Sequence, residues 1–461
     1  MNPLHLQDHA RRAFLRRGTL LGLAGSAAPW ALNLSMLGEA AAAGEPADYK
    51  ALVCIFLYGG CDYGNTLVPV DTTNHATYTR IRGSLAIGRD ALAATTLTPS
   101  VALPSGLQYA MAPSLAPLKT LFDSGRLAVQ LNVGPLIQPT TVAQYQAKSV
   151  RLPAKLFSHN DQQSTWQSDL PEGARNGWGG RIGDLMLSGN GGSVFSCISV
   201  TGNAVFVSGQ QAVQYQLGTS GAVAINGTKS SLFGSATAQA ALTSLVTGTR
   251  SHLLEDEYTR ITRRSIDAEQ RVTAALAALP ALTTTFDSSN SLAMQLRMVA
   301  RIIAARGTLG PRRQVFMVSL GGFDMHDNLV DELPGLQARL AGAMKSFHDA
   351  TVELGVQQQV TAFTASDFGR TLSVNGDGTD HGWGNHHWVM GGAVKGGRFY
   401  GKPPAVAING PDDVGQGRLL PTTSVDEYAA TLATWFGVSD TDLATVVPNI
   451  GNFATRNLGF V

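Results

Sequence analysis

Residues 315–328 read VFMVSLGGFDMHDN, an apolar run that leads straight into two glycines and the polar residues Asp324, His326 and Asp327. Residues 52–62 read LVCIFLYGGCD and repeat the pattern: an apolar run, Gly-Gly, one residue and Asp. Short, nearly continuous apolar runs are typical of strands that are buried on both faces of a parallel sheet. Both stretches therefore predict a buried strand that ends at polar side chains.

Three further apolar runs have the same character and lie at residues 127–133, 194–200 and 360–364. Between the runs, apolar residues recur at helical spacing. These helical patterns cover residues 114–124, 251–279, 290–306, 333–354 and 426–436. Strands that alternate with helices predict an α/β fold with a mostly parallel sheet. Two long connections, residues 71–112 and 201–247, are expected to be inserted loops, the second with room for extra strands.

The composition narrows the class of protein. The chain has 461 residues, of which 44% are hydrophobic and 15% charged, as is typical of a globular protein with a buried core. A formal net charge of +1 offers no basic field, so we exclude nucleic-acid binding. We expect no membrane span in the mature protein, because no apolar stretch there approaches ~20 residues. The three cysteines form no disulfide framework, although a Cys61–Cys197 bridge stays open.

The first 43 residues resemble an export signal. Residues 10–17 read ARRAFLRR, a mildly apolar run follows to residue 37, and small residues at 40–43 offer a cleavage site. This order predicts a twin-arginine signal peptide over residues 1–43, with Arg11 and Arg12 as the pair that the twin-arginine export machinery reads. The alternatives are a chance basic start or an uncleaved anchor. We expect one α/β domain over residues 44–461, located in the periplasm or secreted.

Polar side chains follow three of the predicted strands. Asp62 follows the first, Asp324 and His326 follow another, and Asp367 follows the run at residues 360–364. Ligands of open parallel sheets bind beyond the carboxyl ends of the strands, so we expect these side chains to converge if the three strands are neighbours. Unpaired carboxylates would repel one another, and a divalent cation would remove the conflict. An Asp after Gly-Gly is also often a turn or cap residue, which is the alternative for Asp62.

A loop at residues 379–388, TDHGWGNHHW, adds further candidate ligands. It contains Asp380, His381, His386 and His387, of which the last two are neighbours expected to point apart, with one of them structural. Imidazole and carboxylate together suit zinc, manganese or iron better than calcium. The pattern predicts a metal site at one edge of the sheet.

Two residues beside the predicted metal site have two interpretations each. Ser158, in LFSHNDQQSTWQ at residues 156–167, could cap the following helix, or its hydroxyl could be an activated nucleophile facing the metal. Arg370, three residues after Asp367, could clamp an oxyanion or pair with a carboxylate and hold the loop. The residues alone leave both alternatives open.

Seven segments together resemble one known family. They are LYGGCDYGNTLVP, SHNDQQ, NGWGGRIGDLM, SLGGFDMHDN, ASDFGRT, GTDHGWGNHHWVMGGAVKGGRFYG and VDEYAATLATWFGV. In this order they resemble the exported bacterial family called domain of unknown function 1501, which is regarded as a remote branch of the alkaline phosphatase and sulfatase superfamily. The resemblance covers essentially the whole mature chain. It implies a three-layer α/β/α sandwich like that of alkaline phosphatase.

The resemblance also implies a site and a chemistry. It implies one or two divalent ions, zinc or manganese, beside a hydroxyl nucleophile that opens a helix, here Ser158. The metal ligands that it implies are Asp62, Asp324, His326, Asp367 and His381. The reaction implied is hydrolysis of a phosphate or sulfate ester, with a small-molecule or polymeric anionic ester as substrate.

Three departures from the superfamily pattern favour a single-metal or altered site. Asp324 and His326 are two residues apart rather than four, position 368 is Phe rather than His, and no Cys-x-Pro-x-Arg signature occurs. Two hypotheses follow. The first is a metal-dependent ester hydrolase. The second is a non-enzymatic envelope protein that keeps the fold and binds a polymer or a protein partner through its inserted loops.

Overall fold

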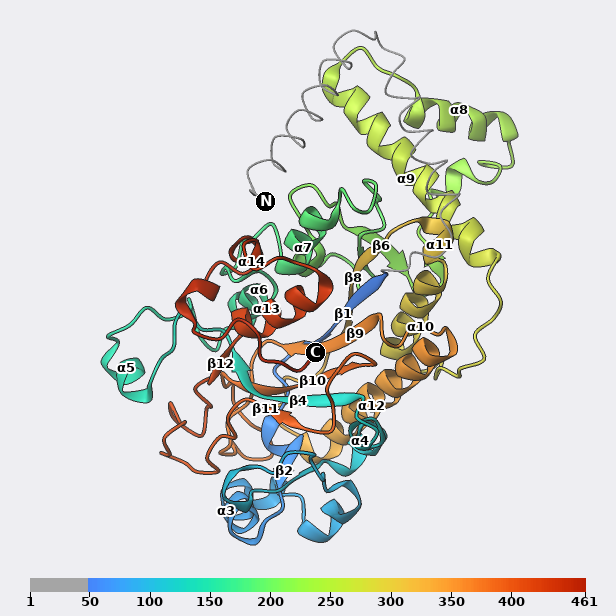
Figure 1. Cartoon of the computed structure of the whole chain (residues 1–461). Helices are drawn as coiled ribbons and strands as arrows, with labels where there is room; N and C mark the ends of the chain where they lie inside the picture. Colours follow the sequence, from blue (N-terminus) through green and yellow to red (C-terminus); the bar gives the residue numbers. More distant parts are fainter. Residues whose placement is uncertain (1–48) are drawn as a thin grey trace, which may run out of the picture. The chain divides into compact units, whose positions relative to one another are not determined.

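The computed structural model describes residues 49–461, so the predicted signal peptide at residues 1–43 lies outside the described residues. The centre of this region is a ten-stranded sheet in the order β11-β4-β10-β9-β1-β8-β5-β6-β7, with β12 paired to β4 (Figure 1). Its strands are β1 Lys50–Leu57, β4 Leu127–Gly134, β5 Cys197–Ser199, β6 Tyr215–Gly218, β7 Gly221–Ala222, β8 Arg313–Leu320, β9 Val360–Ser366, β10 Asn385–Gly391, β11 Phe399–Tyr400 and β12 Thr423–Ser424. Strands β2 Leu67–Pro69 and β3 Tyr109–Met111 form a separate antiparallel ribbon.

The strands predicted from apolar runs are present. The runs at residues 52–58, 127–133, 315–320 and 360–364 are β1, β4, β8 and β9, and the run at 194–200 contains the shorter β5. β1 lies between β8 and β9 and pairs with both in parallel. The prediction of a mostly parallel sheet is confirmed.

One central strand was missed. β10 runs antiparallel between β4 and β9, where the sequence predicted a loop through residue 388. All seven of its residues are buried. Because it begins with Asn385, His386 and His387, it does not read as an apolar run.

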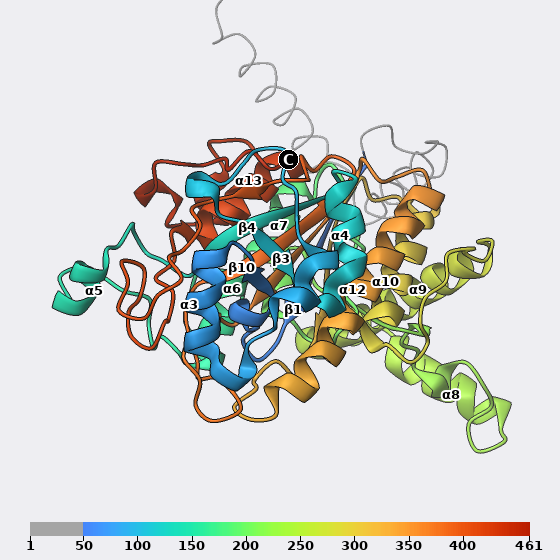
Figure 2. The same ribbon diagram turned by 90° about the horizontal axis from the view of Figure 1, so that it is seen from below.

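Helices cover both faces of the sheet. They are α3 Thr72–Arg82, α4 Ala116–Asp123, α5 Val142–Ala147, α6 His159–Ser168, α7 Trp178–Met186, α8 Ala236–Thr247, α9 Leu253–Ala277, α10 Ser291–Ala304, α11 Arg306–Leu309, α12 Leu329–Glu353, α13 Val425–Phe436 and α14 Leu443–Val446. Seen from below, α4, α10 and α12 gather beside one another (Figure 2). The five helical patterns of the sequence correspond to α4, α9, α10, α12 and α13.

Alternation along β1 shows that the sheet is the middle of three layers. Val53 and Ile55 belong to a core shared with α4, α10 and α12. Their neighbours Leu52 and Cys54 belong to a second core shared with α6, α7, α13 and α14. Successive side chains of a strand point to opposite faces, so each face has its own buried core. The fold is the predicted three-layer α/β/α sandwich.

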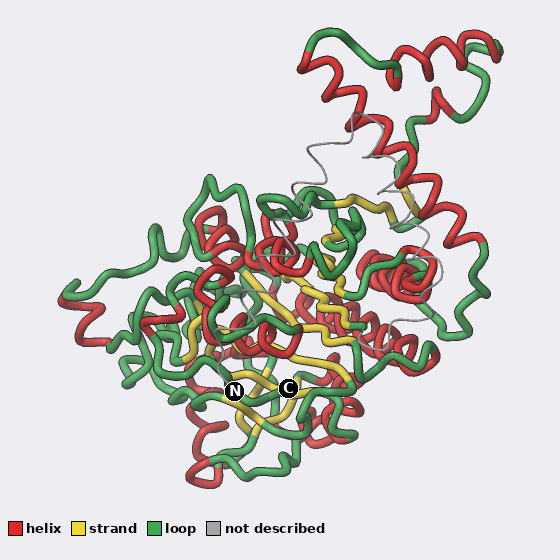
Figure 3. The backbone as a smooth tube through the Cα atoms, turned by 45° about the horizontal axis from the view of Figure 1, so that its top comes forward, coloured by secondary structure: helices red, strands yellow, loops and turns green. Residues whose placement is uncertain are grey.

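The two inserted segments contain regular structure. Residues 71–112 hold α3 and β3, and residues 201–247 hold β6, β7 and α8, so the second segment lengthens the sheet at one edge. In Figure 3, α8 and the first part of α9 extend away from the strands.

The cysteines and the helices answer two further predictions, on a disulfide and on a membrane span. Cys54, Cys61 and Cys197 are buried free thiols, so no Cys61–Cys197 bridge is present. Within residues 49–461, no helix combines the length and the apolar character that crossing a bilayer requires.

Candidate metal centre

Three neighbouring strands end level with one another. Leu57 at the end of β1 lies beside Leu320 of β8 and Ser366 of β9. The segments that follow these strands therefore start from one edge of the sheet, as the carboxyl-end rule requires.

Two glycines let these segments touch. Gly59 and Gly60 have φ values of +117° and +85°. A Cβ on Gly59 would lie 2.3 Å from the backbone nitrogen of Asp324, and one on Gly60 would lie 2.5 Å from the ring of Phe368. Only glycine tolerates both the positive φ and the close approach. The Gly-Gly pair after β1 thus brings that turn against the segments after β8 and β9.

A cluster of imidazoles and a carboxylate lies at this edge. His159, Asp324 and His381 each offer one ligand atom, and these atoms all lie within 4.8 Å of one another. His159 Nε2 lies 3.1 Å from His381 Nε2 and 3.3 Å from Asp324 Oδ2. His326 Nε2 joins from the other side, 3.0 Å from His381 Nε2 and 3.1 Å from Asp324 Oδ1.

The Nδ1 atoms of His159 and His381 have hydrogen-bond partners outside the cluster. His159 Nδ1 lies 2.6 Å from Oδ2 of the buried Asp367. His381 Nδ1 lies 2.8 Å from the backbone oxygen of Phe157. An Nδ1–H that donates outward leaves the lone pair of Nε2 facing the cluster. Two such lone pairs at 3.1 Å repel each other unless a proton or a cation lies between them. Imidazoles oriented in this way by a carboxylate or a carbonyl are the usual ligands of protein-bound metals.

Hydrogen bonds, burial and nearby charges shift the pKa values of the cluster residues in different directions. The hydrogen bond to Asp367 raises the pKa of His159 above its ordinary value. Burial lowers the pKa of His381. Burial would raise the pKa of Asp324, but the hydrogen bond and the charge of Arg370 outweigh it and hold that pKa below its ordinary value. Asp324 thus stays an anion and His381 favours the neutral form, which are the states that bind a cation.

These residues fit a divalent metal. Two or three imidazole nitrogens with a carboxylate match zinc or manganese, and Asp367 Oδ1 is a buried oxygen for which the described residues offer no hydrogen-bond partner. Phe368 packs its ring against His159 and His381, with 4.8 Å between ring centroids in each pair. The ring of Phe368 offers no ligand atom to an ion.

Asp62 is not brought into the cluster. Its Oδ2 forms a buried ion pair with Arg82, and its Oδ1 accepts a hydrogen bond of 3.3 Å from the backbone nitrogen of Gly64. That second bond caps the short 3-10 helix η1, Tyr63–Asn65. The cap alternative noted for an Asp after Gly-Gly describes this residue. The other four predicted ligands, Asp324, His326, Asp367 and His381, do lie together, with Asp367 behind His159.

Arg370 is fully buried and holds the site's loops together. Its Nη1 lies 2.5 Å from Asp324 Oδ1 and 3.2 Å from the oxygen of Gly59. Its Nε donates to Thr379 Oγ1 at 3.1 Å, and its Nη2 donates to the Thr379 oxygen. These contacts match the second interpretation of Arg370, in which it pairs with a carboxylate and holds the loop.

Ser158 is the N-cap residue of α6, but its hydroxyl forms no capping bond. Instead Ser158 Oγ donates to Asp161 Oδ2 at 3.0 Å. The residue just before it, Phe157, has φ of 72°, a strained value that turns its oxygen onto His381. The N-terminus of α6 thus presents His159, rather than a hydroxyl, to the cluster.

His159 is a candidate ligand that was not predicted from the sequence. It lies in the segment SHNDQQ, where the sequence pointed only to Ser158. Gln163, one turn later, donates to Asp367 Oδ2 at 2.8 Å. Residues four apart share one face of a helix, so His159 and Gln163 together were the available signal.

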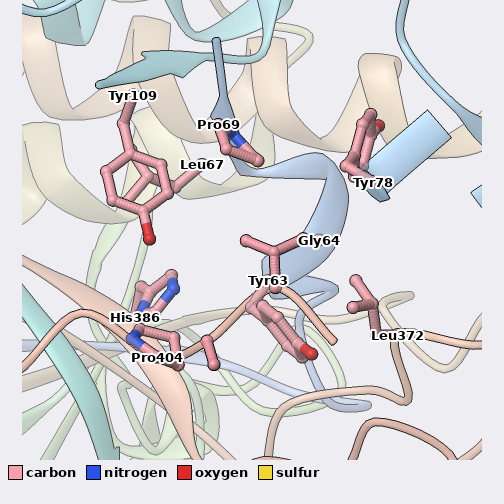
Figure 4. Close-up of a pocket in the computed structure, with 11 residues that line it drawn as sticks. Tyr63, Gly64, Leu67, Pro69, Tyr78, Tyr109, Leu372, His386 and Pro404 are labelled. Carbon is pink, nitrogen blue, oxygen red and sulfur yellow. The ribbon is translucent and has the colours of Figure 1, made fainter. Parts of the chain in front are cut away.

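His386 and His387 take no part in the cluster. Burial lowers the pKa of each to about 3. His386 Nδ1 accepts from the backbone nitrogen of Asn132, and His387 Nδ1 lies 3.2 Å from Thr364 Oγ1. His386 lines a small cavity of about 20 Å³ together with Tyr63 and other residues labelled in Figure 4. Both are structural residues of β10.

Comparisons with known proteins identify one family and a number of distant solved structures. A family model described as "Protein of unknown function (DUF1501)" matches residues 49–450. No curated protein matches the chain.

Among solved structures, Ps i-CgsB in complex with k-i-k-neocarrahexaose is 8% identical with a TM-score of 0.36, over 87% of this chain and 77% of that chain. A Bacteroides thetaiotaomicron structure concerned with the metabolism of multiple glycosaminoglycans is 11% identical with a TM-score of 0.33, over 86% and 74%. A variant of the alkaline phosphatase PafA is 12% identical with a TM-score of 0.27, over 71% and 64%. At such low TM-scores these likenesses carry no argument about what this chain does.

Proposed function

Since the chain belongs to the DUF1501 family, which is described only as of unknown function, its activity has to be inferred from the site, and we propose that it is a metal-dependent hydrolase of phosphate or sulfate esters. We place it in the periplasm or outside the cell, on the strength of the twin-arginine pattern at residues 10–17. The relation to the alkaline phosphatase and sulfatase superfamily belongs to this proposal.

One observation supports the proposal above the others. Nε2 of His159 and of His381 face each other and Asp324, while Asp367 and a backbone oxygen hold the rings from behind. Such a set of imidazoles and an anionic carboxylate would hold one zinc or manganese ion. A bound ion would polarise the ester oxygen and lower the pKa of a water molecule.

The nucleophile in this proposal is water, and Ser158 has a structural role. Ser158 Oγ donates to Asp161, and the position at the start of α6 that faces the cluster belongs to His159. Arg370 would act by keeping Asp324 charged and in place, since its contacts are with Asp324, Gly59 and Thr379. The role of oxyanion donor then falls to the backbone N–H groups at the N-terminus of α6, which favour a bound anion.

The exposure of the cluster bears on the substrate. The side chain of Asp324 is 43% exposed and that of His326 is 45% exposed. A site open to solvent on this side accommodates a bulky substituent on the ester. We therefore favour an anionic ester on a large or polymeric molecule, with small aryl esters as usable assay substrates.

The test combines metal removal with substitution. Chelation should abolish turnover of p-nitrophenyl phosphate or p-nitrophenyl sulfate, and added zinc or manganese should restore it. His381→Ala should remain inactive after metal is added, because it removes a ligand at the centre of the cluster. His252→Ala is the matched control, since His252 is an exposed histidine just before α9. Equal turnover in His381→Ala and His252→Ala would refute the proposal.

A second candidate function is supported by two contacts of the site. Ser158 is held by Asp161, and Phe368 fills the place of a further histidine. Both suit a binding protein that keeps a structural metal and does no hydrolysis. A protein that carries one tightly bound ion, yet turns over neither class of ester with any divalent metal, would favour this function.

A further inference from the structure

The helical arm, defined as α8 and residues 253–266 of α9, carries an apolar stripe. Leu254 is 73% exposed, Tyr258 66% and Ile261 44%. The spacing of four and three residues places these side chains on one face of α9. The arm extends away from the sheet, so the stripe is accessible to a large partner (Figure 3).

The stripe faces away from α8. Thr259 is buried, and Arg263 donates to the oxygen of Thr247 at the end of α8, so this side of α9 packs against α8. Helical geometry puts Leu254, Tyr258 and Ile261 on the opposite side. Over residues 49–461, these three side chains are left largely in contact with solvent.

The charged residues along one border of the stripe are arranged so that opposite charges would meet if two copies of α9 packed together in antiparallel orientation. Glu257 and Arg264 lie on the same flank of α9, two turns apart, and each is adjacent to a stripe residue in the helical repeat. In an antiparallel two-fold pair of α9 helices, Tyr258 of one copy packs beside Ile261 of the partner subunit. The same register places Glu257 of each copy alongside Arg264 of the partner subunit. An isologous interface needs this kind of self-complementarity.

We propose that two copies of this chain form a dimer through the apolar stripe of α9, in an antiparallel arrangement with Glu257 of each copy paired to Arg264 of the other. A lipid surface fits the stripe less well. Its border carries Glu255 and Glu257 beside Arg264, whereas a helix that lies on a membrane carries a surplus of Lys and Arg on its polar face. The interface is small, so we expect a dissociation constant in the micromolar range.

Sedimentation equilibrium of the full chain over a wide concentration range tests the dimer. The unmodified protein should dimerise, and Glu257→Arg and Arg264→Glu alone should each weaken dimerisation about tenfold or more, because like charges then face each other across the interface. The double variant E257R/R264E should recover it. Asp267→Arg is the matched control, an exposed charge reversal on the side of α9 away from the stripe, and should leave dimerisation unchanged.

Three results would overturn the proposal. The first is a monomer at every concentration. The second is a dimer that both single charge reversals leave intact while circular dichroism shows them folded. The third is a monomer in solution that binds phosphatidylglycerol vesicles through Tyr258, which would assign the stripe to a membrane.

Discussion

Nδ1 of His159 lies 2.6 Å from Oδ2 of Asp367, a carboxylate that is fully buried at the end of β9. The same oxygen accepts from Gln163 Nε2 and from the backbone nitrogen of Gly59. Through Oδ2, Asp367 therefore orients the imidazole of His159 and increases its basicity.

Asp367→Asn should weaken metal binding by about 10–100-fold, because it removes the charge that supports His159 while keeping the size of the side chain. Competition against a fluorescent chelator measures this affinity. Asp440→Asn is the matched control, since Asp440 is exposed and has no contact with the cluster residues, and we expect no change there. Equal affinities for the Asp367→Asn variant and the unmodified protein would contradict the role given to Asp367.

The substitution Asp62→Asn tests whether Asp62 is a structural residue or a metal ligand. The substitution leaves the buried Arg82 without its ion-pair partner, so unfolding free energy should fall by roughly 3–5 kcal/mol. The metal content of the folded protein should not change, because Asp62 lies outside the cluster. Denaturant titration and elemental analysis give the two quantities. Metal loss with unchanged stability would instead make Asp62 a ligand.

Ser158→Ala should keep turnover within a few-fold of the unmodified protein and leave metal content unchanged. The reason is that Ser158 Oγ donates to Asp161 and water is the proposed nucleophile. Initial-rate measurements on a phosphate and a sulfate ester provide the test. A loss of about a thousandfold with fold and metal intact would restore Ser158 as the nucleophile.

Asp426 gives the protein a pH-dependent stability. It is buried in the first turn of α13, and burial raises its pKa to about 7. Burial, and then the charge of Asp426, also raise the pKa of Asp169. A carboxyl that holds its proton more tightly in the folded state contributes stability that is fully present below about pH 4 and is lost as pH rises through about 7.

Asp426→Asn should therefore stabilise the protein at pH 8 by roughly 1–3 kcal/mol relative to the unmodified chain. The gain should shrink as the pH falls towards 4 and disappear below it, where Asp426 is protonated in both the folded and the unfolded state. The amide keeps an oxygen for the backbone nitrogen of Asn449, which bonds Asp426 Oδ1 at 2.9 Å. Denaturant unfolding at several pH values measures the difference. A gain of equal size at pH 4 and pH 8, or one matched by the exposed control Asp440→Asn, would contradict this assignment.

Much of the sheet was predictable because its parallel strands are buried on both faces. β1, β4, β8 and β9 read as apolar runs for that reason. β10 was not predictable in the same way, because His386 and His387 are buried polar residues whose partners, Asn132 and Thr364, come from the flanking strands β4 and β9. The hydrophobic pattern of a sequence depends only on the polarity of each side chain, whereas tertiary contacts decide whether a polar side chain can be buried.

Part of the site was predictable from where its residues lie relative to the ends of the predicted strands. Asp324, His326 and Asp367 follow level strand ends, and the sequence located those ends. The pairing of Asp62 with Arg82 was not visible, because twenty residues and a helix separate the two. His159 was not predictable in this way, because its partners His381 and Asp367 lie more than two hundred residues away in the sequence.

The most direct test of the metal centre is a crystal of the protein soaked in zinc, with anomalous diffraction measured on both sides of the zinc absorption edge. We predict one anomalous peak, about 2.0–2.1 Å from Nε2 of His159 and of His381, with Asp324 as a further ligand. A peak elsewhere on the chain, or none at this cluster when zinc is present in excess, would contradict the account.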